Sequence, residues 1–351
     1  MWKRFLPFVG AACTLLLVPA LSACGSSSNG PETLTVITHS SFSITGSLLK
    51  QFETQNNATV KLVPKGDAGA MLTSLILTKN NPEGDVSFGV DNVLLGRAKA
   101  AGIFEPYSSP LLSEVPADLQ ADANGLVTPI DYGYVNFNYD IAALQKEGLP
   151  VPQTLEDLTK PIYKGKVVVE NPASSSPGVD FLVATVAYFG KDKYLNWWAQ
   201  MRANGLVVVD GWEAAYNTNF TLHGGAQPIV LSYASSPPYE QMTAKPPRAD
   251  APTGNILPPK GAFREIEYAG ILKGTKHLAL AKKFIDFLLS KQVQEDVPGQ
   301  MAVYPVNKTA AVPPAFAKFG KIDVPAANVS SAEIAANEQQ WIDAWTKTVL
   351  Q

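Results

Sequence analysis

Strand-like and helix-like segments alternate along the first part of this chain, and this alternation restricts the fold more than any other feature of the sequence. Each short apolar run that fits a buried strand is followed by a segment with apolar residues at helical spacing. The expected strands are 34–38, 59–63 and 86–90, and the expected helices are 46–55, 70–78 and 94–101. This order predicts a parallel sheet with helices on both faces and ligand sites at the carboxyl ends of its strands.

A second group of elements begins at Asp131. Residues 131–140 alternate in polarity and are rich in aromatic side chains, which is typical of a half-buried strand. Further strands are expected at 166–170, 206–209, 229–233 and 265–272, followed by an amphipathic helix at 278–289. A proline-rich coil and then a helix with Trp341 and Trp345 would complete the chain. These elements predict a second α/β lobe.

The length of the chain also favours two lobes, since 351 residues are too many for one compact core. We expect the first lobe to contain 33–129 with 263–302, and the second lobe to contain 130–262 with 303–351. Asp131 and Tyr132 would then lie where the chain crosses between the lobes. Two lobes joined in this way can close around a ligand by a hinge motion.

The first thirty residues have the pattern of an export signal. A basic start at 1–4 precedes the apolar stretch 5–20, and small residues precede Cys24. The ending Leu-Ser-Ala-Cys at 21–24 is similar to the bacterial lipobox, whose cysteine is lipidated. An ordinary cleaved signal that contains a cysteine is the alternative. We expect a signal at 1–23, a serine-rich tether at 24–32 and a protein outside the cytoplasm, anchored to the cell membrane through Cys24.

Charge and motif content exclude several classes of protein. The net charge is −3, and loss of Lys3 and Arg4 with the signal would make it about −5, so no nucleic-acid partner is expected. Loss of Cys13 would leave no pair for a disulfide. The three histidines are far apart, and no G-x-S-x-G, H-E-x-x-H or Walker motif is present. We therefore predict a binding protein rather than an enzyme, with no metal or cofactor, and expect a monomer.

Serine-rich and aromatic segments follow several of the expected strands. The run Ser174-Ser175-Ser176-Pro177-Gly178 precedes a helix, where free N–H groups and hydroxyls can hold an anion; a plain N-cap is the alternative. Asp67 could cap a helix or bind a ligand amino group or cation. Aromatic and hydroxyl side chains at two further strand ends could hold a flat ring or a cation, or pack within the lobe: Trp212, Tyr216, Tyr233, Ser236 and Tyr239.

The order and spacing of these segments resemble the thiamine-binding proteins of bacterial ABC importers. The matching strings are T-V-x-T at 35–38, G-D at 66–67, D-V-x-x-G-x-D-N-x-L-L at 85–95, D-Y-G-Y at 131–134, N-P-x-S-S-S-P-G at 171–178, G-W-x-x-A-Y at 211–216, L-S-Y-x-S-S-P-x-Y at 231–239 and Y-P-V at 304–306. The resemblance implies an α/β, two-lobed periplasmic-binding-protein fold of type II, with a mainly parallel sheet flanked by helices in each lobe. It also implies a receptor that passes thiamine, or its phosphate esters, to an ABC permease and its ATPase.

The resemblance also implies roles for the site residues. Asp67 would meet the aminopyrimidine or the positive charge, and Trp212 and Tyr239 would pack on the rings. Ser174, Ser175, Ser176 and Gly178 would hold the hydroxyethyl or phosphate end. The chain departs from the family pattern at His39, which stands in place of a tyrosine, at Ala302, in place of a tryptophan, and at Ala173, in place of a basic residue. His39 could replace a stacking ring or be a polar residue at a strand end, and Ala173 puts the binding of phosphate esters in doubt.

Two other functions fit the same scaffold. One is a receptor for another solute, such as ferric iron, a polyamine or a phosphonate. Ferric binders use tyrosine oxygens, and this chain has no tandem tyrosine pair. The other is an extracellular enzyme or adhesin.

Overall fold

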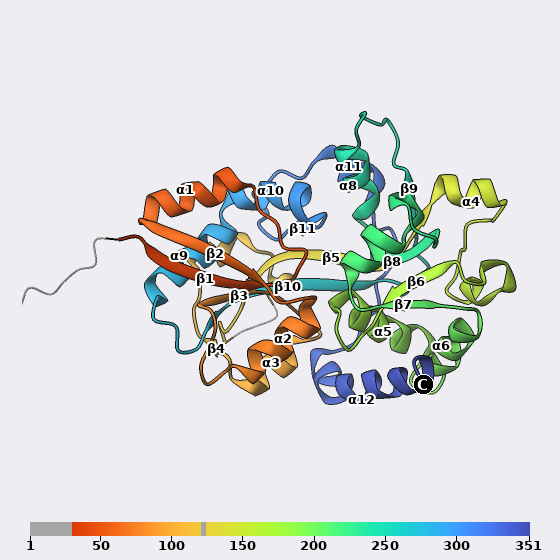
Figure 1. The fold of residues 1–351 in the computed structure, drawn as a ribbon, viewed down its shortest axis with the longest axis horizontal. Helices are drawn as coiled ribbons and strands as arrows, with labels where there is room; N and C mark the ends of the chain where they lie inside the picture. The colour runs from red at the N-terminus through yellow and green to blue at the C-terminus, as the bar shows by residue number, and fades with distance from the viewer. Residues whose placement is uncertain (1–29, 121–123) are drawn as a thin grey trace, which may run out of the picture. The chain divides into compact units, whose positions relative to one another are not determined.

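The structure, a computed structural model, describes residues 30–120 and 124–351 (Figure 1). The predicted signal at 1–23, Cys24 and most of the tether lie outside the described residues. Within the described part of the chain, no helix combines the length and the apolar character that crossing a bilayer requires.

Strands and helices lie close to their predicted positions. The strands are β1 (Glu32–Thr38), β2 (Ala58–Pro64), β3 (Val86–Asp91), β4 (Phe104–Glu105), β5 (Thr128–Asp140), β6 (Val167–Glu170), β7 (Val207–Val209), β8 (Ile229–Tyr233), β9 (Thr253–Ile256), β10 (Phe263–Leu272) and β11 (Tyr304–Pro305). The helices are α1 (Gly46–Asn56), α2 (Ala68–Leu77), α3 (Leu95–Ala101), α4 (Ile141–Glu147), α5 (Ser176–Phe189), α6 (Tyr194–Ala203), α7 (Trp212–Ala214), α8 (Ser236–Thr243), α9 (Leu278–Leu289), α10 (Lys291–Met301), α11 (Pro314–Phe319) and α12 (Ser331–Val349). Short 3-10 turns occupy η1 (Pro110–Glu114), η2 (Ala117–Leu119), η3 (Glu156–Thr159), η4 (Pro161–Tyr163) and η6 (Thr221–His223), and η5 (Ala215–Asn219) is a π-helical turn.

The strands form one mixed sheet with the order β2-β1-β3-β10-β5-β8-β6-β7. At one end β1 pairs in parallel with β2 and β3, and at the other end β6 pairs in parallel with β7 and β8. The antiparallel pair of β10 and β5 joins the two parallel groups, because β10 also pairs with β3 and β5 also pairs with β8. In Figure 1 these two strands cross the middle of the molecule. The predicted α/β fold with parallel strands is confirmed, and its two parallel groups share a continuous sheet.

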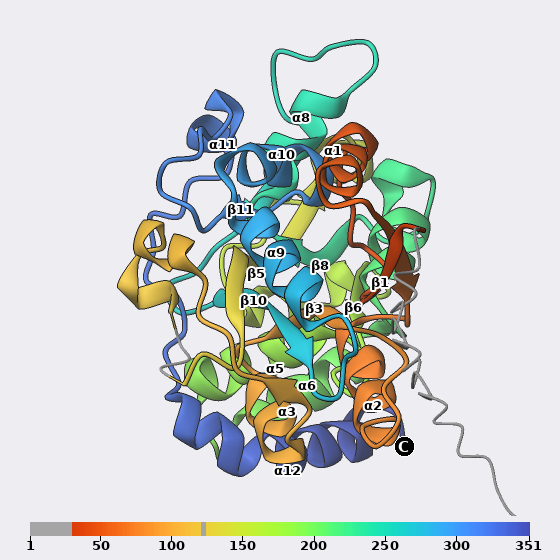
Figure 2. The same ribbon diagram turned by 90° about the vertical axis from the view of Figure 1, so that its left-hand side faces the viewer.

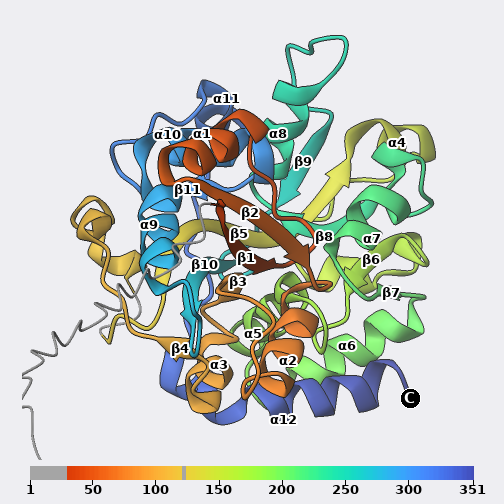
Figure 3. The same ribbon diagram turned by 60° about the vertical axis from the view of Figure 1, so that its left-hand side comes forward.

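Helices cover both faces of the sheet, as the alternating pattern predicts. Figures 1 and 3 show α1, α9 and α10 on one side of β1–β3 and α2 and α3 on the other. At the opposite end α5 is buried along residues 176–186 because its apolar side chains face the sheet on one side and α6 and α12 on the other. Figure 2 shows α12 running beneath α3, α5 and α6.

One prediction about the C-terminal part is wrong. The segment after α9 is the helix α10, although it contains Pro298, and not a coil. Val293, Val297 and Pro298 are buried, and the side-chain amide of Gln294 donates to the carbonyls of Ile130 and Leu288 at 2.8 and 2.9 Å. These contacts stabilise the helix against the loss of one backbone hydrogen bond at the proline.

The C-terminal helix is fixed to the body by a buried pair of tryptophans. Trp345 is fully buried and meets Trp198 edge to face, with 5.5 Å between ring centroids. The indole N–H of Trp198 in turn donates to the hydroxyl of Thr185 at 3.0 Å. The contact therefore joins α12, α6 and α5 in one cluster.

Replacing Trp345 by alanine should lower the free energy of unfolding by about 3–5 kcal/mol, because it removes a large buried ring and leaves a cavity. Urea denaturation followed by circular dichroism measures the change. Leu350→Ala is the control, since that side chain is 46% exposed at the end of the same helix, and it should change stability by less than about 0.5 kcal/mol. Equal losses of unfolding free energy in both variants would contradict the conclusion that the buried Trp345 fixes α12 to the body.

Candidate ligand-binding site

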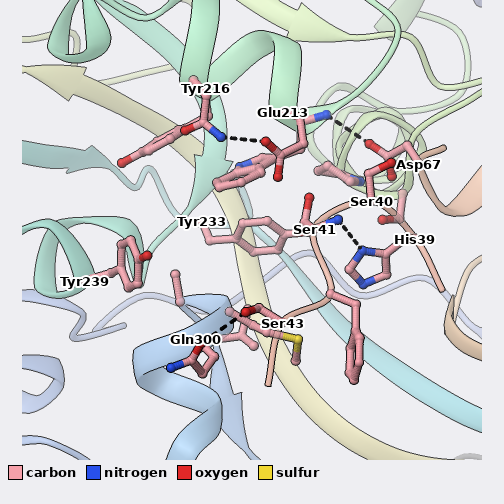
Figure 4. Close-up of a pocket in the computed structure, with 18 of the residues that line it drawn as sticks. His39, Ser40, Ser41, Ser43, Asp67, Glu213, Tyr216, Tyr233, Tyr239 and Gln300 are labelled. Atoms are coloured by element: carbon pink, nitrogen blue, oxygen red, sulfur yellow. Dashed lines mark hydrogen bonds between the residues drawn. The ribbon is translucent and has the colours of Figure 1, made fainter. Parts of the chain in front are cut away.

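A cavity of about 440 Å³ lies at the carboxyl ends of strands from both parallel groups (Figure 4). Its walls come from the loop 39–43 after β1, the start of α2, the first turn of α5, the segment 212–217 after β7, the end of β8 and helix α8. His223 of η6, Glu267 of β10 and residues 300–303 at the end of α10 complete it. The volume is typical of small-molecule sites, and the position at the strand ends follows the rule for open α/β sheets.

The structure brings together seven of the eleven predicted ligand-binding residues. The residues that line the cavity are His39, Asp67, Ser176, Trp212, Tyr216, Tyr233 and Tyr239. Four others do not line it: Ser174, Ser175, Gly178 and Ser236. Contact with a ligand stays a prediction for all eleven.

The serines outside the cavity use their hydroxyls within the protein. Ser175 caps its own helix by accepting from the N–H of Gly178, and the Ser174 hydroxyl donates to the carbonyl of Asp210 at 2.6 Å. Gly178 lies against β6, where a β-carbon would stand 2.9 Å from the carbonyl oxygen of Glu170. The Ser236 hydroxyl shares a hydrogen bond with Ser232 at 3.0 Å. The plain N-cap is therefore what the structure has at the start of α5, and only Ser176 and Pro177 of the predicted anion loop line the cavity.

An aromatic wall stands on one side of the cavity. The rings of Trp212 and Tyr216 stack at 4.9 Å with 13° between their planes, and the Trp212 indole N–H donates to Ser232 at 2.8 Å. His223 lies 5.3 Å from the Tyr216 ring and pairs with Glu240 at 3.1 Å. The Trp212 ring is thus held in place before any ligand enters, which lowers the cost of binding a flat ring.

Asp67 has a structural role as well as a place in the cavity. One carboxylate oxygen accepts from the N–H of Ala68 at 2.7 Å at the start of α2, and the other accepts from the N–H of Trp212 at 2.9 Å. Gly211 lies beside it, and a β-carbon there would stand 2.7 Å from the carboxylate oxygen that accepts from Trp212, so a larger residue would displace this oxygen. A nearby bond from the N–H of Ala70 to the carbonyl of Ser174, at 3.1 Å, joins the same two segments.

His39 is buried at the opposite side, where its ring faces an acid. Its Nε2 lies 3.0 Å from Glu267, and its Nδ1 accepts from the N–H of Ser41 at 3.1 Å, so the neutral ring carries its proton on Nε2 (Figure 4). Burial opposes the charged ring, but the charge and hydrogen bond of Glu267 outweigh it and raise the pKa of His39. The same pairing lowers the pKa of Glu267, although burial acts against it.

Further carboxyl groups are buried close to Glu267. Burial raises the pKa of Asp91 to about 7 and raises the pKa of Asp131, Asp180 and Glu265 well above their usual range. Hydrogen bonds from Tyr233 and Ser176 act against this shift in the pKa of Glu265. Oxygens of Asp91, Asp180 and Glu265 lie within 4.8 Å of one another, which is an arrangement that could hold a metal ion. The raised pKa values favour the protonated, uncharged form of these carboxyls over a cluster of buried negative charges.

Sequence reasoning missed part of the cavity. Ser40, Ser41 and Ser43 follow β1 directly, so the strand-end rule could have found them. The Ser43 hydroxyl donates to Gln300 at 3.0 Å, and Thr45 donates to Asp296 through its N–H and hydroxyl, so this loop is tied to α10. Glu213 lies within the string at 211–216 and Glu240 directly follows the string at 231–239, but neither was singled out. No local pattern indicates Glu267 in the middle of β10.

Comparison with known proteins identifies the class. Residues 84–325 match the family of bacterial extracellular solute-binding proteins, and the chain belongs to this family. The prediction of an extracytoplasmic binding protein rather than an enzyme is thereby confirmed.

More particular similarity is to thiamine-binding periplasmic proteins. That of Escherichia coli K12 is 30% identical over 342 residues, covering 95% of this chain and 98% of the relative, and that of Brucella suis is 30% identical over 322 residues, covering 90% and 91%. A solved periplasmic thiamin binding protein has a TM-score of 0.79 and 30% identity, over 91% of this chain and 96% of the other. The binding protein AfuA of Actinobacillus pleuropneumoniae, at 24% identity and a TM-score of 0.77 over 92% and 99% of the two chains, shares the fold. The two-lobed fold of type II and the resemblance deduced from the motifs are confirmed.

The pair of His39 and Glu267 should make stability depend on pH. A raised pKa means that protonated His39 stabilises the fold fully below its unfolded pKa of about 6.5, and that this gain is lost as the pH rises through the folded value. Glu267, whose pKa is lowered, stays charged throughout this window. The stability difference between the wild type and His39→Gln should therefore be larger at pH 6 than at pH 9, as measured by urea denaturation.

His277→Gln is the control, because His277 pairs with Glu32 at the surface and does not line the cavity. A stability difference between the wild type and His39→Gln that grows as the pH rises would contradict the proposed ion pair of protonated His39 with Glu267.

Proposed function

We propose that this protein captures thiamine in the cavity and delivers it to an ABC permease with its ATPase. The main observation in support of this proposal is that the stacked rings of Trp212 and Tyr216 line a cavity that Asp67 also lines. Thiamine has a flat aminopyrimidine and a cationic thiazolium ring, and aromatic faces and carboxylates attract both. The similarity to thiamine-binding periplasmic proteins over nearly the whole chain supports the same ligand.

Each part of the ligand has a suitable partner. Trp212 would stack on one ring, and Tyr239 from α8 would contact the other face of the ligand. Asp67 would meet the amino group or the positive charge with the lone pairs that Ala68 and Trp212 leave free. Ser176 and Tyr233 would line the remaining wall.

The lobes would open and close by movement about β5 and β10. With lobes of 33–129 plus 263–302 and of 130–262 plus 303–351, the bonds of Asp67 to Trp212 and of Ala70 to Ser174 run from one lobe to the other. These bonds would stabilise the closed form in which the ligand is shielded from water.

A lipid on Cys24 would hold this receptor at the cell membrane, beside its permease. The lipobox-like ending at 21–24 and the serine-rich tether at 24–32 support the anchor. A diacylglyceryl group has two chains, which is enough for a lasting anchor where one chain is marginal. We propose that the anchored receptor acts as a monomer.

Titration calorimetry of the mature protein with thiamine should give a Kd near the nanomolar range, about −12 kcal/mol. Ligand at a thousand times Kd should also stabilise the fold by about 4 kcal/mol in a thermal-unfolding assay. No heat at micromolar protein, or a coloured protein that binds Fe³⁺ in place of thiamine, would overturn the proposal.

Trp212→Ala should weaken thiamine binding by about 1–3 kcal/mol, because it removes the ring that forms the aromatic wall. The same titration measures the loss. Tyr188→Ala is the control, because this substitution also removes an aromatic ring but Tyr188 does not line the cavity. The Tyr188→Ala variant should bind thiamine as tightly as the wild type. Unchanged binding by Trp212→Ala would show that the ligand lies elsewhere.

A further inference from the structure

We propose that the cavity selects thiamine itself and discriminates against its phosphate esters. This inference rests on the proposed function and goes further, because it names the charge of the ligand that the site accepts. Three features of the cavity carry it: the sign of the charges on its wall, the hydrogen bonds that already engage the serine loop before α5, and the neutral character of the polar side chains in the loop 40–43 and at Gln300.

The charged side chains on the cavity wall are mostly acidic. Four acids line it, namely Asp67, Glu213, Glu240 and Glu267, and among the described residues no lysine or arginine does. Two histidines also line it, but His39 faces Glu267 and His223 faces Glu240. Even with both histidines protonated the wall would carry a charge of −2, and with both neutral it would carry −4.

The serine loop before α5 has little left to offer a phosphate. Its N-terminal N–H groups and hydroxyls are largely engaged, because Ser175 caps the helix and Ser174 donates to Asp210. Ala173 is exposed and brings no charge to this loop. A phosphate at this position would find neither a guanidinium fork nor a free nest of N–H groups, which are the usual means of binding such an anion.

The other polar part of the cavity suits a neutral hydroxyl group. The loop 40–43 contributes three serine side chains, and the Gln300 amide lies beside Ser43 at 3.0 Å. Hydroxyls and amides can both donate to and accept from the hydroxyethyl group of thiamine. Without a cation nearby, they do not offset the cost of removing a phosphate dianion from water.

The charge on the ligand therefore decides how tightly the cavity binds it. Free thiamine carries one positive charge, so the acidic wall attracts it. Each phosphate adds negative charge that the same wall repels at distances below the Debye length of roughly 8 Å. We expect thiamine monophosphate to bind at least about tenfold more weakly than thiamine, and the diphosphate more weakly still.

Competition calorimetry with thiamine, its monophosphate and its diphosphate at 20 mM and 500 mM NaCl tests this proposal. Higher salt should narrow the gap between thiamine and its esters by screening the wall. Glu213→Gln should narrow it too, because Glu213 is exposed at the rim and its carboxylate is removed without loss of side-chain length. Glu156→Gln is the matched control, since Glu156 is exposed, accepts one side-chain hydrogen bond and does not line the cavity.

The possible results separate this inference from the proposed function. If none of the three compounds binds, the proposed function and the inference both fail. Esters that bind as tightly as thiamine, or tighter, overturn the inference and leave the proposed function standing. A tenfold preference for thiamine that neither salt nor Glu213→Gln reduces would overturn the electrostatic cause. Thermal unfolding of both variants checks that they are folded.

Discussion

The antiparallel pairing of β5 and β10 is the interaction on which the rest of the structure depends. These two strands carry the hydrogen bonds that unite the parallel groups at either end of the sheet. They also place Asp131 and Glu267 in register at the centre, where both are buried. Because two long strands are the shared element, each parallel group can present its strand ends to the same cavity while remaining part of one hydrogen-bonded sheet.

Much of this fold could be predicted from local patterns. The six elements from β1 to α3 and the helix α9 follow apolar periodicity, which reflects burial of one face and so appears directly in the sequence. Helix α10 was missed because the buried contacts of Gln294 and Val297 outweigh the effect of Pro298, and such contacts come from distant segments. The joining of both parallel groups through β5 and β10 is likewise a long-range pairing without a local signature.

Part of the cavity lining could also be predicted, because some of its residues stand at strand ends, which local patterns reveal. Trp212 follows β7 and Tyr233 is the last residue of β8, so a rule about strand ends finds them without knowledge of the tertiary fold. Three hydroxyls in sequence do not reveal that Ser174 and Ser175 form hydrogen bonds with the backbone around them, so the position of these two serines outside the cavity lining could not be predicted. Glu267 lies within a strand, and its position opposite His39 arises because β3 pairs with β1 on one side and with the distant strand β10 on the other.

The double use of Asp67 limits how this receptor can change during evolution. One carboxylate caps α2 and also accepts the backbone N–H of Trp212, so any substitution that alters recognition at this position also loosens a helix and the neighbouring aromatic wall. Ser40 and Ser43 are exposed, and the Ser43 hydroxyl makes a single side-chain hydrogen bond, to Gln300, rather than capping a helix. New ligand preferences in descendants of this protein should therefore arise first in the loop after β1, while the aspartate changes last.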